Sequence, residues 1–178
     1  MDKQITTLTT LVTELLDLSK IKSGRLFLKK SYFAINSLII EVIDEINHIH
    51  PDYIFSFEKN AEPLVNADRD RLGQVLINFL TNAVKYSPDS NVIKVMSNTT
   101  GNNVVISVED SGIGISRANQ ERIFERFFRV EGRNERSFPG FGIGLFIAAE
   151  IVERHNGSIG VKSEEGQGST FYFSIPID

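Results

Sequence analysis

The chain has 178 residues, of which 41% are hydrophobic, and a formal net charge of −4. This length and apolar content fit one ordinary domain, and the lack of cysteine excludes a disulfide framework and a thiolate zinc site. The acidic balance does not favour nucleic-acid binding, which usually needs a strongly basic face. No apolar run approaches the ~20 residues that cross a bilayer, and no signal peptide opens the chain, so we expect a soluble piece without membrane contact.

Residues 1–24 form the first predicted element. Apolar residues recur there at three- and four-residue intervals, with no turn signal before Ser23-Gly24, which predicts an amphipathic helix closed by a glycine. Its leucine stripe covers residues 5–18, and no second long helix follows at once to pack on it. Such a stripe either marks an interface, which predicts a dimer in a longer protein, or folds back on its own domain.

A strand, a helix and a second strand are predicted next. The strand covers residues 25–33, and Asn36-Ser37 is the expected cap of a helix that Pro51 stops. Residues 53–58 alternate between apolar and polar in the manner of a half-buried strand.

The helix predicted between a capping Asp68 and Ser87-Pro88 carries two amides on one side. Asn78 and Asn82 lie one turn apart and Lys85 follows three positions later, so the three residues share a face opposite a broad apolar stripe. This face is either a solvated surface or a site for a metal–phosphate group. Two polar residues extend it towards the start of the helix, Arg71 and Gln74.

The remaining pattern completes a mixed sheet with helices on one face, an α+β, two-layer sandwich. The predicted elements are strands over 92–97 and 104–109, a helix over 116–128, a polar and mobile stretch over 131–139, a helix over 143–155, and strands over 158–161 and 169–175.

Asp110 begins a turn, Asp110-Ser-Gly-Ile-Gly114, where the strand over 104–109 ends. Its carboxylate can accept a hydrogen bond from the exocyclic amine of adenine, whereas guanine presents a carbonyl there, so such a site favours ATP over GTP. The two glycines allow a close backbone approach. Taken alone, the same residues are typical of an ordinary Asx turn.

A second glycine-rich segment, Gly140–Leu145, opens the helix predicted over 143–155. The free N–H groups and the dipole at a helix start favour a phosphate. The segment is neither a Rossmann fingerprint, because no strand leads into it, nor a P-loop, because the chain has no Gly-Lys-Ser/Thr. Alone, it is equally typical of a hinge.

Together and in this order, these motifs resemble the catalytic and ATP-binding domain of sensor histidine kinases, which has the Bergerat (GHKL) fold. The amide helix resembles the N box, and the two glycine segments resemble the first and second glycine boxes. Residues 124–129 resemble the F box, and residues 166–170 resemble the last glycine box. Residues 15–24 resemble the end of the second helix of the dimerisation and histidine-phosphotransfer hairpin. The resemblance covers the whole chain and implies a remnant of that hairpin over 1–24 and the catalytic domain over 25–178.

The resemblance also implies roles for single residues. Asn82 would coordinate Mg²⁺ through its side-chain carbonyl with Asn78 nearby, Lys85 would reach the phosphates, and Asp110 would read the adenine. Magnesium needs few protein ligands because ATP oxygens and waters fill its octahedron. The other residues implied around the nucleotide are Tyr86, Gly112, Gly114, Ile115, Gly140, Gly142, Gly144, Leu145, Phe146 and Thr170. The candidate partners of phosphate charge, which are otherwise surface arginines, are Arg126 and Arg129.

The implied function is to bind Mg-ATP and to donate the γ-phosphoryl group to a histidine. Related gyrase-type ATPases and heat-shock chaperones carry a glutamate base where this chain has Asn78. An amide cannot take a proton from water, so a general-base contribution of roughly 10²- to 10⁴-fold is unavailable and slow hydrolysis is expected. The alternatives are an ATPase of that type and a degenerate ATP-binding scaffold, which Phe141, Phe146 and Asn156 suggest because they depart from the family pattern.

The acceptor histidine of the family is missing from the sequence. No Ser-His-Glu-Leu-Arg-like segment occurs, His48 and His50 are expected to be surface residues at a helix end, and His155 is expected to be structural. We therefore expect a fragment that binds ATP without phosphorylating itself. The resemblance further implies a homodimer in the full-length protein, a response regulator as partner, and a cytoplasmic location.

Overall fold

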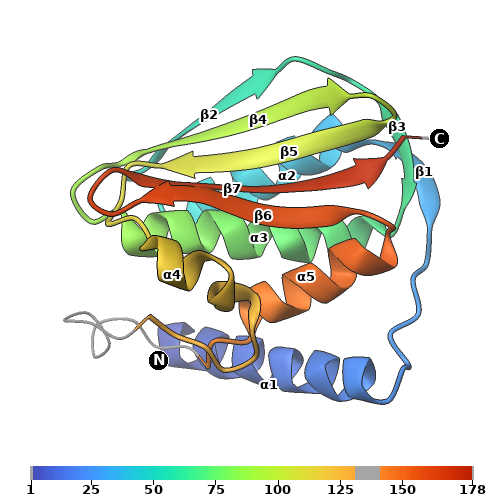
Figure 1. Cartoon of the computed structure of the whole chain (residues 1–178), viewed down its shortest axis with the longest axis horizontal. Coiled ribbons are helices and arrows are strands. Elements are labelled where there is room, and N and C mark those ends of the chain that lie inside the picture. The colour runs from blue at the N-terminus through green and yellow to red at the C-terminus, as the bar shows by residue number, and fades with distance from the viewer. Residues whose placement is uncertain (1, 131–140, 178) are drawn as a thin grey trace.

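The computed structural model describes residues 2–130 and 141–177 and contains a sheet, a layer of helices against it and one outlying helix (Figure 1). The elements, in chain order, are α1 (Asp2–Lys22), β1 (Ser31–Ala34), α2 (Ile35–Ile49), β2 (Ile54–Lys59), β3 (Leu64–Ala67), α3 (Arg69–Tyr86), β4 (Val92–Thr100), β5 (Asn103–Asp110), α4 (Arg117–Gln120), the 3₁₀ turn η1 (Arg122–Phe124), α5 (Gly144–Arg154), β6 (Ser158–Glu164) and β7 (Gly168–Pro176).

The main sheet has five strands in the order β2-β4-β5-β7-β6. The β2 and β4 strands are parallel and the other neighbours are antiparallel, so the sheet is mixed as predicted. Helices α2, α3 and α5 cover one face, and α1 lies beyond α5 on the side away from the sheet (Figure 1). The predicted α+β, two-layer architecture with a leading helix is therefore confirmed.

The core lies between the sheet and helices α2, α3 and α5. The ring of Phe79, on the apolar side of α3, is fully buried and lies 5.4 Å from the ring of Phe171 and 6.0 Å from that of Phe173, both on β7. Truncating a buried aromatic side chain of this kind costs about 3–5 kcal/mol of stability. This packing fixes the polar side of α3 relative to the sheet.

The start of α3 is held by a buried aspartate. Asp68 caps the helix as predicted: its Oδ1 accepts from the backbone N–H of Arg71 at 3.1 Å, and its Oδ2 accepts from the backbone N–H of Lys29 at 2.7 Å. The backbone N–H of Asp68 donates to Nε2 of His155 at 2.9 Å. His155 is buried, so its predicted structural role is confirmed.

Two predictions near the start of the catalytic body are wrong. Of the strand predicted over 25–33, only residues 31–33 are in a ladder, as part of β1, because the partner strand β3 is only four residues long; β3 was not predicted from the sequence. Asn36 does not cap α2, which begins at Ile35. The Asn36 side chain is instead buried and donates to the carbonyl of Ala61 at 2.6 Å.

The prediction of a continuous helix over 116–128 is also wrong. Only α4 and η1 form there, because the apolar residues pack singly rather than along one helical face. Ile123 is buried, Phe124 and Phe128 pack against the core, and Phe127 between them is 59% exposed with a φ of 62°. The other predicted helices and hairpins are confirmed with slightly different ends. The stretch over 131–139 lies outside the described residues.

Helix α1 has one packed side and one exposed side. Leu18 is buried and Ile21 packs against the core, whereas an exposed apolar stripe runs along the helix: Leu8, Val12, Leu15 and Leu16. The predicted glycine closure is confirmed, since the N–H groups of Gly24 and Arg25 donate to the carbonyls of Ile21 and Lys20 and Gly24 has a φ of 67°. The alternative that α1 folds back on its own domain therefore holds for the side that carries Leu18 and Ile21, and the interface alternative stays a prediction. None of the described helices is long and apolar enough to cross a bilayer.

Candidate functional site

The two amides of α3 form one hydrogen-bonded pair. Nδ2 of Asn82 donates to Oδ1 of Asn78 at 3.2 Å, and both side chains are half-buried. This bond uses the N–H of Asn82 and not its carbonyl oxygen, which is the atom that a metal would need. One turn further, Nζ of Lys85 lies 4.9 Å from the centroid of the Tyr86 ring. The structure thus brings Asn78, Asn82, Lys85 and Tyr86 together along one side of α3.

The start of α5 lies directly against this pair. A Cβ atom on Gly144 would overlap Nδ2 of Asn78, so a side chain at this position would displace the Asn78 amide. Gly144, Leu145 and Phe146 form the first turn of α5, and their N–H groups have no acceptor within the helix. Three donors at a helix start beside two amides make an environment that suits an anion. Gly140, the first residue of this predicted segment, lies outside the described residues.

Asp110 is the last residue of β5, and its side chain is buried. Its Oδ1 accepts from the N–H of Gly112 at 2.8 Å and from Oγ of Ser87 at 3.2 Å, and the N–H of Ser169 also donates to the carboxylate. Burial raises the pKa of Asp110 above its ordinary value, and these hydrogen bonds oppose the shift. The Asx turn and the proposed adenine acceptor are therefore the same group.

Two glycines allow the turn after Asp110 to pack between α3 and the β6–β7 turn. A Cβ on Gly112 would overlap the carbonyl of Tyr86, and one on Gly114 would overlap the carbonyl of Glu164. Gly114 also has a φ of 69°, which favours glycine. The backbone N–H of Ile113 donates to the backbone carbonyl of Tyr86 at 3.1 Å. The end of α3 and the predicted adenine pocket are thus joined by backbone contacts.

Of the two remaining residues predicted around this pocket, Ile115 faces the core and Thr170 does not. The N–H of Ile115 donates to Oγ of Ser163 at 2.8 Å, and its side chain packs against the core. Thr170 alternates along β7 with the buried Ser169 and Phe171, so its side chain lies on the opposite face of the sheet from α3. Thr170, which the resemblance implies around the nucleotide, is therefore turned away from α3, and its neighbour Ser169 lies on the inner face, where its N–H contacts Asp110.

Ser169, Ser163 and Ser87 were not predicted as site residues, and all three are hydroxyl groups near Asp110. The signals for Ser169 in the sequence are its place in the segment that resembles the last glycine box, residues 166–170, and the two-residue period of its strand. An open cleft of about 360 Å³ lies where β5 ends beside the β6–β7 turn, and Asp110, Lys162 and Thr170 are in its lining. Its lining contains none of the α3 residues.

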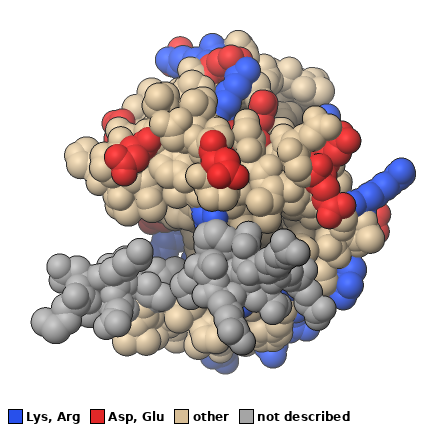
Figure 2. All heavy atoms as spheres, turned by 90° about the vertical axis from the view of Figure 1, so that its left-hand side faces the viewer, with Lys and Arg blue, Asp and Glu red and all other residues tan. Residues whose placement is uncertain are grey.

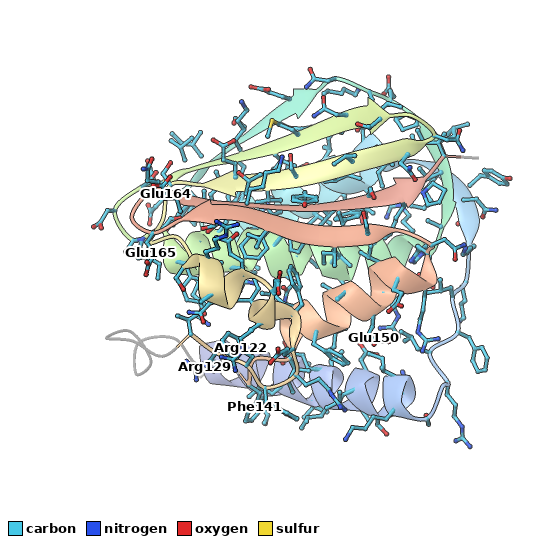
Figure 3. All side chains as sticks on the ribbon, in the orientation of Figure 1. Arg122, Arg129, Phe141, Glu150, Glu164 and Glu165 are labelled. Carbon is cyan, nitrogen blue, oxygen red and sulfur yellow. The ribbon has the colours of Figure 1, made fainter. Side chains whose placement is uncertain are left out.

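Arg126, Arg129 and Phe146 lie near the start of α5. Cζ of Arg126 is 5.5 Å from the centroid of the Phe146 ring, and a Cβ on Gly142 would lie 3.1 Å from Cγ of Arg129. The N–H of Phe127 donates to the carbonyl of Gly142 at 3.0 Å, which ties the predicted F-box segment to this turn. Figure 3 labels Arg129 and Phe141 at the end where this segment passes α1, and Glu164 and Glu165 at the β6–β7 turn.

The charge around the site is divided. Figure 2 shows this end of the molecule, where acidic side chains gather over the sheet and a basic side chain lies in the recess below them. The described residues contain no group of three or more Asp, Glu, His or Cys that could hold a metal ion.

The family model described as "Histidine kinase-, DNA gyrase B-, and HSP90-like ATPase" matches residues 67–178, which contain both glycine turns and all of α3. The chain belongs to this family. It is 35% identical over 176 residues to the signal transduction histidine-protein kinase ArlS of Staphylococcus epidermidis, which covers 98% of this chain and 39% of ArlS. It is 36% identical over 171 residues to the sensor histidine kinase WalK of Bacillus subtilis, covering 93% of this chain and 28% of WalK.

Solved structures of the family have the same architecture. Full-length ShkA in complex with AMPPNP superposes with a TM-score of 0.84 at 27% identity, covering 96% of this chain and 36% of ShkA. The catalytic domain of the histidine kinase ThkA has a TM-score of 0.71 at 34% identity, covering 84% of this chain and 97% of that domain. The chain is thus homologous to the ATP-binding catalytic half of sensor histidine kinases, and it spans less than half the length of the curated relatives.

Proposed function

We propose that this chain binds Mg-ATP along the polar side of α3 and donates the γ-phosphoryl group to a histidine on a dimerisation hairpin. The observation that carries the proposal is the contact of Gly144 with Asn78, which places an amide pair directly beside the free N–H groups at the start of α5. Asp110 lies at the other end of α3, linked to it through Ser87. A nucleotide bound with adenine at Asp110 has its phosphates beside the amides.

The donor set fits a magnesium–triphosphate group. Asn82 would supply a neutral carbonyl oxygen, Lys85 a cation, and Gly144, Leu145 and Phe146 the backbone N–H groups. Mg²⁺, when bound, neutralises charge on the phosphoryl group that is transferred. The protein groups act by positioning the phosphates, and none of them is an acid or a base in the reaction.

Transfer is favoured over hydrolysis because Asn78 cannot activate water. Its Oδ1 accepts from Asn82, and an amide has no basic atom for a proton. ATP held without a base for water remains available to an imidazole nucleophile. We expect ATP turnover by the isolated chain to be far slower than that of the ATPases of this family.

The departures from the family pattern do not favour a silent scaffold. The Phe146 side chain packs against the core, which leaves its N–H at the first turn of α5. Asn156 has a φ of 57°, and asparagine is among the residues that tolerate this conformation in place of glycine.

The division into a hairpin remnant over 1–24 and a catalytic body over 25–178 is part of the proposal. The exposed stripe of α1, residues 8–16, supports it, because that apolar face has no cover within the described part of the chain. ThkA has been solved in complex with the response regulator protein TrrA. By analogy, we propose a response regulator as partner of the full-length protein, a homodimer as its assembly, and the cytoplasm as its location.

Titration with AMPPNP, with and without Mg²⁺, tests the site. Asn82→Ala should remove the metal dependence, whereas Asn47→Ala, on the exposed side of α2, should leave it unchanged. Equal metal dependence in both variants would refute the metal assignment. Supplying a family dimerisation hairpin in trans with labelled ATP then tests transfer, and a hairpin that stays unlabelled while the chain binds ATP would refute the kinase assignment.

A further inference from the structure

Helix α1 is attached to the catalytic body through a buried carboxylate. Asp17 is 2% exposed, and its Oδ2 accepts from Nη1 of Arg71 at 2.7 Å and from Nε2 of Gln74 at 2.9 Å. Nη1 of Arg71 also donates to Oε1 of Gln74 at 2.9 Å, so the two α3 side chains form one receptor for the carboxylate. Charge-assisted hydrogen bonds of this kind are roughly twice as strong as neutral ones. Asp17 is therefore an anchor that fixes how α1 lies on α3.

The anchor determines where a second carboxylate lies. Glu14, one helical turn before Asp17, projects from the same side of α1. Its Oε1 lies 3.5 Å from the position that a Cβ on Gly144 would take, which is the position next to Nδ2 of Asn78. Burial raises the pKa of Glu14 above its ordinary value, and the positive charge of Lys85 opposes this shift. Glu14 thus lies among the residues that the proposed function assigns to the phosphates.

We propose that α1 is an autoinhibitory latch, in which Asp17 holds Glu14 at the phosphate end of the nucleotide site and the Glu14 carboxylate opposes the terminal phosphate of ATP. This inference rests on the proposed function, because it assigns the competitor of the same site. Glu14 and a phosphate are both anions, and both would draw on the charge of Lys85. Binding of ATP and docking of α1 then oppose each other, and each weakens the other by the same factor.

If Glu14 were a metal ligand, its removal would change the affinity for ATP in the opposite direction. A carboxylate beside Asn78 could instead ligate the magnesium ion that accompanies ATP, and its removal would then weaken binding. The direction of the change in affinity therefore separates competitor from ligand.

The experiment measures the dissociation constant of Mg-AMPPNP for the full chain by calorimetry. Glu14→Gln should tighten binding by about fivefold, the effect of removing one nearby like charge in a hydrated site. Asp17→Asn should also tighten binding by releasing α1, but it should add little in the Glu14→Gln background because it acts through Glu14. The matched control is Glu45→Gln on the exposed side of α2, which should leave the affinity unchanged.

Hydrogen exchange of the α1 amides supplies the reciprocal measurement. Mg-AMPPNP should accelerate exchange in α1 of the parent chain, and Asp17→Asn should do so without nucleotide. Equal affinity of Glu14→Gln and the parent chain overturns the latch but leaves the proposed function intact, and weaker binding assigns Glu14 as a metal ligand. Failure of every variant and of the parent chain to bind AMPPNP overturns the proposed function and the latch with it.

Discussion

Replacing Asp110 by asparagine should separate nucleotide binding from stability. The carboxylate accepts from Gly112, from Ser87 and from the N–H of Ser169. Asparagine keeps one oxygen acceptor and puts an NH₂ group in place of the other, so one partner loses its acceptor at a cost of about 1–3 kcal/mol. Burial raises the pKa of the Asp110 carboxyl, which means that its charged form is disfavoured there, so removing the charge offsets part of that cost. We therefore expect the free energy of unfolding to change by at most about 2 kcal/mol.

The affinity for ATP should change by more. A hydrogen bond from the adenine amine to a charged acceptor contributes about 1.5–3 kcal/mol, so Asp110→Asn should weaken AMPPNP binding by about 10- to 150-fold. The new NH₂ group can donate to the carbonyl of guanine, so the preference for adenine over guanine nucleotides should narrow. Calorimetric titration with both analogues and urea unfolding measure these effects, with Asp52→Asn at an exposed site as the control. An Asp110→Asn chain that binds AMPPNP within about twofold of the parent would refute the assigned role.

Three further changes test the folding of the site. Gly114→Ala should lower the free energy of unfolding by more than about 2 kcal/mol in urea titrations, because its Cβ would overlap a backbone carbonyl and its φ is 69°; an unchanged midpoint would contradict this. Burial depresses the pKa of His155 in the folded state, so stability should be full above the unfolded pKa of about 6.5 and should fall as pH decreases through the folded value. Unfolding measured between neutral and acidic pH checks this, and His155→Gln should flatten the dependence. Phe127→Gly should leave the stability unchanged or raise it by up to about 1 kcal/mol, because it relieves a positive φ at an exposed residue. Phe124→Gly should instead destabilise the protein, because Phe124 packs against the core. An equal fall in melting temperature for the two variants would contradict this prediction.

Local signals in the sequence predicted much of the fold and the α3 half of the site. The Asp68 cap and the Ser87-Pro88 end depend on side chains within a few residues, and both are confirmed. The spacing of Asn78 and Asn82 is a property of any helix, so their shared face follows directly from the sequence. These features could be predicted because no distant residue decides them.

The features that the sequence did not reveal depend on partners far along the chain. Asn36 resembles a helix cap, but the carbonyl of Ala61 draws its side chain into the interior. Arg71 lies on the predicted polar face, but its partner is Asp17, 54 residues earlier. Ser169 was missed because only the register of β7 against β5 shows which of its side chains meets Asp110. Each case requires the tertiary arrangement, which short-range patterns do not contain.

The segment between α1 and β1 is held against the body, and this restricts how α1 can move. Leu26 is 3% exposed and its carbonyl accepts from Arg154 at 3.3 Å, so the segment after it is pinned to the body. Any rotation of α1 must therefore pivot near Gly24. A helix of 21 residues is about 32 Å long, so a rotation of about 20° at this pivot sweeps the distant end through about 11 Å. Once the bonds from Asp17 to Arg71 and Gln74 are broken, a small angular change at the pivot is thus enough to move the leading end of α1 over a large distance.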